Sequence, residues 1–200
     1  MRTCCEIKIC GLTRRRDVEL AVELGAAAVG FVLVPASPRF VPPERLAELV
    51  CHLPPGVKRV GVFADAPAAE IRRLVPELLD VAQLHGAEPA AFAAGLGVPV
   101  WKAFHLCRSA DLVLPEGYPA ERLLLDAASG GSGRTCDWSL AAAAAKRWRV
   151  MLAGGLCREN IRRAIETVHP FGVDLSSALE ESPGMKSERK MREFFKEIAE

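Results

Sequence analysis

The sequence predicts an α/β protein of the (β/α)₈ TIM-barrel class, formed by a single domain over residues 1–200. Eight short apolar runs recur along the chain, amphipathic helical windows separate most of them, and chemically active residues gather where the runs end. Near-continuous apolar strands that alternate with helices indicate a parallel sheet covered on its outer side. The number of runs matches a closed barrel, and a doubly wound open sheet is the alternative.

The predicted elements follow one another in strict alternation. Strands are expected at about 5–10, 28–34, 57–63, 81–85, 99–105, 122–126, 149–154 and 172–177. Helices are expected at about 14–25, 43–52, 67–75, 88–95, 138–147, 158–168 and 186–199, and several of them open with a proline or a capping residue. The fifth connection, "LCRSADLVLPEGYPAE", has two prolines, a glycine and no helical period. We therefore expect a loop in place of the fifth helix.

Composition limits the partners and the compartment. A net charge of +1 gives no electrostatic case for nucleic acid or an anionic membrane as partner. No apolar stretch approaches the roughly 20 residues that cross a bilayer, and we expect a cytoplasmic protein. The seven cysteines are odd in number and never spaced C-x-x-C, which favours reduced thiols over disulfides or a zinc ribbon. The scattered histidines predict no metal cluster, and we expect neither metal nor cofactor.

In a barrel of this class the active site lies at the carboxyl ends of the strands, so these positions carry the functional prediction. The candidate residues found there are Cys10, Arg39, Gln83, His85, Asp126, Gly130, Gly131, Gly133, Gly154, Gly155, Ser176 and Ser177. Glycines after the late strands let backbone N–H groups approach an anion, and a following helix N-terminus adds partial positive charge. The three late loops together predict a phosphate site.

Cys10 and Asp126 end the first and sixth predicted strands and could face each other as base and acid. A thiol serves as a base only where its thiolate is favoured. We expect Thr13 to cap a helix whose dipole, with Arg14 to Arg16, lowers the pKa of Cys10. Asp126 must be buried to hold its proton. A buried structural thiol and a capping or paired carboxylate remain the alternatives.

Two further candidates have structural alternatives as well. Arg39 lies in a predicted loop, where its guanidinium suits a carboxylate or a phosphate, although such an arginine can also be solvated. His85 could act in catalysis or hydrogen-bond its neighbours and fix a loop.

The motifs resemble one family, phosphoribosylanthranilate isomerase. They are "KICGLT", "GFV" with "SPRFV", "GVF", "QLHG", "LLLDAASGGSG" with "DW", "LAGGL" with "EN", and "GVDLSSALEESPGMKS", in order from Lys8 to Ser187. The resemblance implies a cofactor-free Amadori rearrangement of N-(5-phosphoribosyl)anthranilate, with Asp126 as general acid and Cys10 as general base. It also implies that Arg39 binds the anthranilate carboxylate, that Gly154, Gly155, Ser176 and Ser177 bind the phosphate, and that residues 130–133 line the substrate.

Two departures from the family pattern carry expectations of their own. Ala178 replaces a glycine beside the phosphate site, and an added Cβ there costs about 1 kcal/mol if the position needs a positive φ. Ser187 stands where the family usually has an aspartate, so we expect the loss of a local cap or an ion pair.

Other functions stay open at this point. The related phosphoribosyl-aminoaldose isomerase of histidine biosynthesis typically uses two aspartates, whereas this chain offers a cysteine. A barrel that binds phosphorylated ligands without turning them over is the third hypothesis. The expected partner is a small phosphorylated substrate, and the chain is expected to be a monomer or a homodimer.

Overall fold

The computed structural model describes residues 5–105, 117–126 and 137–199. Within them, parallel strands β1 to β8 pair in sequence order and β8 pairs with β1, which closes a barrel and confirms the predicted fold class. The strands are β1 (Glu6–Ile9), β2 (Ala28–Val32), β3 (Lys58–Phe63), β4 (Val81–Leu84), β5 (Val100–His105), β6 (Arg122–Asp126), β7 (Val150–Leu152) and β8 (Gly172–Leu175). Each lies inside the range that the apolar runs predict.

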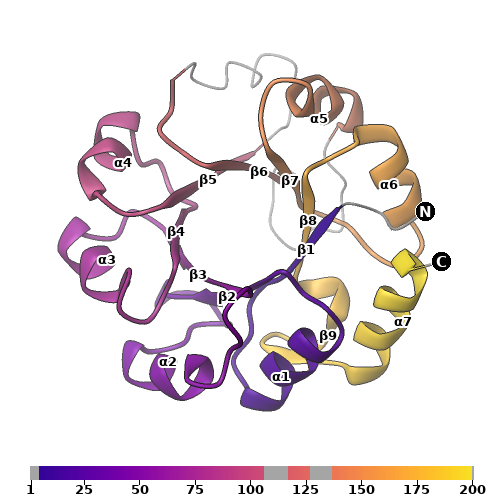
Figure 1. The fold of residues 1–200 in the computed structure, drawn as a ribbon, viewed down its shortest axis with the longest axis horizontal. Coiled ribbons are helices and arrows are strands. Elements are labelled where there is room, and N and C mark those ends of the chain that lie inside the picture. Colours follow the sequence, from indigo (N-terminus) through magenta and orange to yellow (C-terminus); the bar gives the residue numbers. More distant parts are fainter. Residues whose placement is uncertain (1–4, 106–116, 127–136, 200) are drawn as a thin grey trace.

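An outer layer of helices surrounds the strands (Figure 1). They are α1 (Arg15–Glu23), α2 (Pro43–Val50), α3 (Ala68–Leu74), α4 (Ala90–Leu96), α5 (Trp138–Ala145), α6 (Ile161–Val168) and α7 (Glu188–Ala199). After β8 come a 3₁₀ turn, η2 (Ser177–Leu179), and a small antiparallel pair, β9 (Glu180–Ser182) and β10 (Met185–Lys186). None of the described helices is long and apolar enough to cross a membrane.

Local sequence determines the cap of α5, whereas a tertiary contact takes up the residue expected to cap α1. Asp137 caps α5 by accepting a hydrogen bond from the Ser139 backbone N–H at 2.9 Å, as its residue type predicts. The prediction that Thr13 caps α1 is wrong. Arg14 occupies that position without a side-chain cap, while the Thr13 hydroxyl donates to the Gly184 carbonyl oxygen at 2.6 Å.

The alternation of side chains along each strand divides the core into two parts. Outward residues pack under the helices in one large apolar cluster, which includes Ile9, Val29 and Leu84. Inside the barrel, two smaller clusters fill successive levels: Ala28, Val60, Val81 and Trp101, then Ala103, Leu124, Met151 and Ala153. The barrel is therefore a packed core that supports a site at the ends of its strands.

The fifth connection lies mostly outside the described residues, which exclude 106–116. Its described part, residues 117–121, contains a turn and no helix.

Replacing Gly172 by alanine is expected to destabilise the barrel. A Cβ at this position in β8 would lie 2.6 Å from the Met151 Sδ and 2.7 Å from the Glu6 carbonyl oxygen, and the backbone atom cannot move without disturbing β1. Gly172→Ala should lower the free energy of unfolding by about 1–3 kcal/mol, measured by urea unfolding.

Gly95→Ala is the matched control, because no heavy atom lies within 4 Å of the added Cβ in α4. It should leave stability unchanged or raise it by up to about 1 kcal/mol. Equal effects of the two substitutions would contradict the packing argument.

Candidate active site

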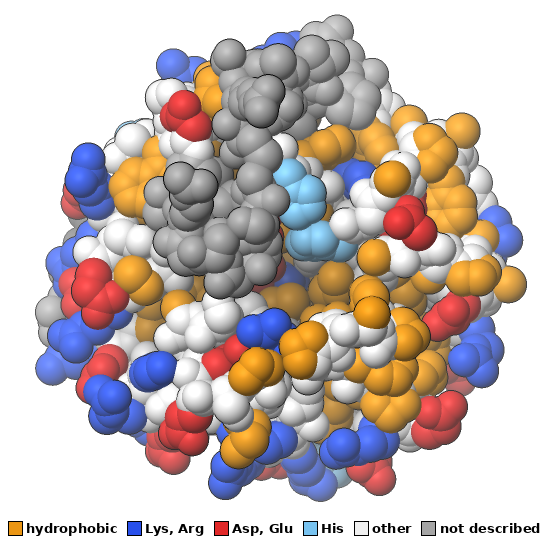
Figure 2. All heavy atoms as spheres, turned by 180° about the vertical axis from the view of Figure 1, so that it is seen from behind, with side chains coloured by type: hydrophobic (Ala, Val, Ile, Leu, Met, Phe, Trp, Pro, Cys, Tyr) orange, Lys and Arg blue, Asp and Glu red, His pale blue; other side chains and the backbone are white. Residues whose placement is uncertain are grey.

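A cavity of about 330 Å³ opens at the carboxyl ends of the strands. The surface is hollowed there, and histidine side chains lie at the hollow (Figure 2). Its lining includes Cys10, Arg39, Gln83, His85, Asp126, Gly154, Gly155, Ser176 and Ser177. All of the predicted site residues that the structure describes therefore meet in one cavity. The remaining three, Gly130, Gly131 and Gly133, lie outside the described residues.

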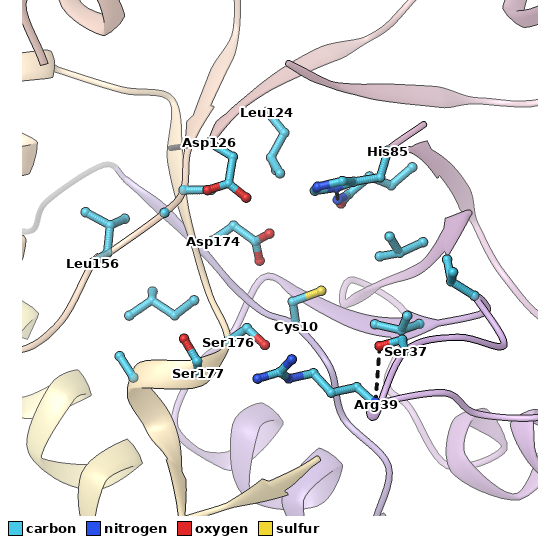
Figure 3. A pocket seen from close by; sticks show the side chains of 18 of the residues that line it. Cys10, Ser37, Arg39, His85, Leu124, Asp126, Leu156, Asp174, Ser176 and Ser177 are labelled. Carbon is cyan, nitrogen blue, oxygen red and sulfur yellow. Dashed lines mark hydrogen bonds between the residues drawn. The ribbon is translucent and has the colours of Figure 1, made fainter. Parts of the chain in front are cut away.

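Cys10 is held at the end of β1 by the barrel itself. Its backbone N–H donates to the Leu175 carbonyl oxygen at 2.8 Å, and only 8% of the residue is exposed. The thiol points into the cavity, toward which Asp126 and Asp174 also point (Figure 3). Gly30 on β2 makes room for it, since a Cβ there would lie 2.8 Å from the Cys10 Sγ.

The charge beside Cys10 comes from inside the barrel. Burial raises the pKa of the Cys10 thiol, and Lys8 and Lys186 oppose this rise by favouring the thiolate. Lys8 lies two residues before Cys10 on the same face of β1, and its Nζ forms an ion pair with Asp174 at 2.9 Å. Its side chain is completely buried.

The prediction that Arg14 to Arg16 supply this charge is wrong. The Arg14 guanidinium binds the Asp17 carboxylate at 2.7 Å, and the side chains of Arg15 and Arg16 are 57% and 73% exposed. Exposed charges are screened by water, whereas Lys8 acts at short range in a buried site.

Arg39 reaches the cavity from the loop after β2. The Ser37 hydroxyl accepts a hydrogen bond from the Arg39 backbone N–H at 3.1 Å (Figure 3). The guanidinium binds Glu180 in a bidentate arrangement, at 2.9 and 2.7 Å. Glu180 also accepts from the Lys186 Nζ at 2.8 Å. Burial alone would raise the pKa of Glu180, but Arg39 and Lys186 lower it below its usual value. Two cations thus share one carboxylate, which leaves positive charge for an anionic ligand.

The loop after β7 has the backbone geometry of an anion site. Gly154 and Gly155 have φ values of 74° and 64°, in the left-handed region that glycine adopts without strain. The Asn160 side chain braces this loop by donating to the Gly155 carbonyl oxygen at 2.8 Å and accepting from the Cys157 N–H at 2.9 Å. Ser176 and Ser177 complete the same end of the cavity (Figure 3).

The two departures from the family pattern have local explanations. Ala178 lies in η2 and is not among the described non-glycine residues with a positive φ, so the expected backbone strain is wrong. Ser187 directly precedes α7, and its backbone N–H donates to the Leu179 carbonyl oxygen at 2.8 Å. Serine is itself a preferred residue type before a helix.

His85 and Gln83 form the wall opposite the serines. The Gln83 Nε2 lies 3.4 Å from the His85 Nδ1. Burial, followed by the nearby charge of His105, lowers the pKa of His85 to about 4. His85 is therefore a neutral imidazole near neutral pH.

Sequence reasoning missed four charged residues of the site: Lys8, Asp174, Glu180 and Lys186. The sequence did contain a signal for Lys8 and Asp174, because a charged residue inside a buried strand needs a partner. Lys8 and Asp174 both interrupt apolar strands, and they are register partners on β1 and β8. The cluster of Glu180 and Lys186 has no comparable signal, since it forms in the irregular segment after β8.

The fold and the cavity define a (β/α)₈-barrel protein of the enzyme type, with its polar residues at the carboxyl ends of the strands. The family model of N-(5'-phosphoribosyl)anthranilate (PRA) isomerase matches residues 7–197. This chain belongs to the PRA isomerase family.

Individual relatives agree with that membership. The N-(5'-phosphoribosyl)anthranilate isomerase of Pelobacter propionicus is 44% identical over 196 residues, which are 96% of this chain and 94% of the relative. The crystal structure of the Thermus thermophilus phosphoribosyl anthranilate isomerase is also 44% identical, with a TM-score of 0.88 over 97% of this chain and 98% of that one. A third isomerase, in complex with reduced 1-(o-carboxyphenylamino)-1-deoxyribulose 5-phosphate, is 37% identical, with a TM-score of 0.88 and the same coverage.

Asp174→Asn is expected to make Cys10 more reactive. The substitution keeps the shape of the side chain but removes a negative charge that disfavours the thiolate. It also breaks the buried ion pair with Lys8 and lowers stability, so the rates are compared under conditions in which circular dichroism shows the variant folded. Alkylation of Cys10 by iodoacetamide near neutral pH should accelerate several-fold, because a shift of one pKa unit changes the thiolate fraction about tenfold.

Peptide mass spectrometry can follow the modification of Cys10, with the exposed Cys51 in the same protein as an internal reference. An unchanged or slower rate at Cys10, with Cys51 constant, would contradict the assigned electrostatics.

Proposed function

We propose that this chain converts N-(5-phosphoribosyl)anthranilate to 1-(2-carboxyphenylamino)-1-deoxyribulose 5-phosphate, with Asp126 as general acid and Cys10 as general base. The observation that carries the assignment is that both side chains point into one cavity, from β6 and from β1, next to an anion-binding end (Figure 3). Such a pair needs no metal to move protons.

The reaction begins with ring opening. Asp126 donates its proton to the furanose ring oxygen, the bond between that oxygen and C1 breaks, and the nitrogen lone pair forms a protonated Schiff base. Asp126 is only 9% exposed, so its carboxyl group is largely shielded from bulk water.

Proton abstraction follows at C2. The Cys10 thiolate takes the C2 proton, and the released electron pair flows toward the iminium nitrogen to give an enolamine. This intermediate tautomerises to the ketone. Burial raises the pKa of Cys10 and Lys8 opposes part of that rise, while the iminium strengthens the carbon acid, so a small thiolate fraction is a sufficient base.

The two ends of the cavity suit the two anionic ends of the substrate. We assign the phosphate to Gly154, Gly155, Ser176 and Ser177, where backbone N–H groups and hydroxyls can donate. Arg39 is assigned to the anthranilate carboxylate, for which Glu180 is a competing acceptor. Gln83 and His85 line the same cavity.

The biological setting is part of the proposal. The chain would act as one domain over residues 1–200, in the cytoplasm, on a small phosphorylated substrate and without nucleic acid. A monomer and a homodimer both suit this reaction, because the cavity residues named above all belong to one chain.

Removing either proton-transfer group should abolish most of the turnover. Cys10→Ser and Asp126→Asn are expected to lower kcat by about 10²–10⁴-fold, the range of general acid–base catalysis. The unstable substrate can be generated from anthranilate and phosphoribosyl pyrophosphate by the preceding transferase, and its fluorescence decay followed. Cys51→Ser, at an exposed thiol, is the control.

Wild-type turnover by either variant would remove that residue from the mechanism. Decay at the uncatalysed rate with the wild type, together with saturable product binding, would instead identify a barrel that binds without turnover. Turnover of the histidine-pathway aminoaldose would show that the two substrates overlap.

Arg39→Met is expected to raise KM more than it lowers kcat. Losing a charge-assisted hydrogen bond of about 1.5–3 kcal/mol corresponds to a decrease of about ten- to a hundredfold in kcat/KM. Glu180→Gln should have the opposite effect on KM, because it weakens the competing acceptor of Arg39. An unchanged KM for Arg39→Met would show that the arginine serves the fold and not the substrate.

A further inference from the structure

Three potential metal ligands come together at the ends of neighbouring strands. His85 follows β4, His105 ends β5 and Asp126 ends β6, and one ligand atom from each lies within 4.8 Å of the other two. His105 and Asp126 are also register partners on paired strands. His85 and His105 are separated by 19 residues in the sequence, and the barrel brings them together where the sequence pattern gave no reason to group them.

We propose that His85, His105 and Asp126 bind a divalent transition metal ion, with Zn²⁺ as the best fit. Two imidazoles and one carboxylate are a ligand set that Zn²⁺ accepts, with water in the fourth position. Metal–nitrogen distances of about 2.0–2.1 Å place tetrahedral ligand atoms about 3.3 Å apart. The ligand atoms lie within 4.8 Å of one another here, so any pair more than about 3.3 Å apart closes on the ion by side-chain rotation.

The rings are arranged for such a closure. The centroids of His85 and His105 are 5.4 Å apart, close to the roughly 5 Å between two imidazoles that share one zinc ion. His105 is exposed and therefore has the freedom to move, whereas the half-buried His85 is more restricted. The Gln83 Nε2 lies 3.4 Å from the His85 Nδ1, and a flip of the amide would turn its Oε1 toward this nitrogen to accept the ring N–H, as outer partners of metal ligands do.

The surrounding charges permit a cation. A histidine binds a metal ion as the neutral imidazole, through a ring-nitrogen lone pair. Two lysines lie near His85, but each is paired. The Lys102 Nζ lies 2.7 Å from Glu88, and the Lys8 Nζ lies 2.9 Å from Asp174. Their repulsion of a bound metal ion is thereby reduced.

The ligand chemistry sets the selectivity. Imidazole suits Zn²⁺, Ni²⁺ and Cu²⁺, whereas Mg²⁺ and Ca²⁺ prefer sets of oxygen ligands. The site is therefore expected to take up Zn²⁺ and to ignore Mg²⁺.

Metal binding has a consequence for the reaction. Asp126 cannot bind Zn²⁺ and donate a proton to the substrate at the same time, so Zn²⁺ should inhibit turnover. This consequence rests on the proposed role of Asp126, whereas metal binding itself does not.

Calorimetric titration of the reduced protein with Zn²⁺ near neutral pH tests the site. The wild type should bind one ion at the site, and His105→Ala should weaken this binding at least tenfold. His52→Ala is the matched control, because His52 is exposed and lies next to the Cys51 thiol, the alternative soft ligand on the surface. Circular dichroism verifies that each variant is folded.

Equal Zn²⁺ affinity of the wild type and His105→Ala would overturn the proposal, as would a loss of binding in His52→Ala alone. Mg²⁺ binding as tight as that of Zn²⁺ would also overturn it. A wild type that binds Zn²⁺ through His105 but shows no metal-free turnover would support the site while the proposed function fails. If the metal-free wild type turns over the substrate but His105→Ala has no effect on Zn²⁺ affinity, the proposed function stands and the metal site is overturned.

Discussion

The buried ion pair between Lys8 and Asp174 is the interaction on which both the barrel and its site depend. The two residues are register partners across the seam where β8 meets β1, so the pair forms only when the barrel is closed. Removing one partner would leave a buried charge uncompensated, which is strongly destabilising. The same lysine lies beneath Cys10 and favours its thiolate. The same lysine therefore stabilises the closed sheet and favours the thiolate of Cys10.

A second charged cluster ties the end of the chain to the mouth of the barrel. Glu180 of β9 binds Arg39 from the loop after β2 and Lys186 of β10. The Lys186 Nζ also donates to the Ser176 carbonyl oxygen at 3.0 Å. The small antiparallel pair thus connects Arg39 to the segment that carries Ser176. A ligand that withdraws Arg39 from Glu180 must alter the contacts of Lys186 as well.

The sequence predicted the strands and most of the site because both depend on local pattern. Apolar runs locate the strands, and the topology of the barrel brings their ends together, so Cys10 and Asp126 could be placed in one cavity from spacing alone. The errors concern partners that are distant in the chain. Thr13 bonds to Gly184 instead of capping α1, and Lys8 finds Asp174 at the other end of the chain. Pattern reveals that a buried lysine needs a partner, but only the closed sheet identifies it.

Asn160 restrains the turn after β7 and so lowers the entropic cost of binding a ligand there. Its side chain holds the segment from Gly155 to Cys157 at both ends, so the turn carrying the two glycines is constrained before any anion arrives. Conformational entropy in this turn is lost when the protein folds and not when the ligand binds. An anion that binds to this turn would therefore meet a preorganised backbone, and more of its interaction energy would remain as affinity.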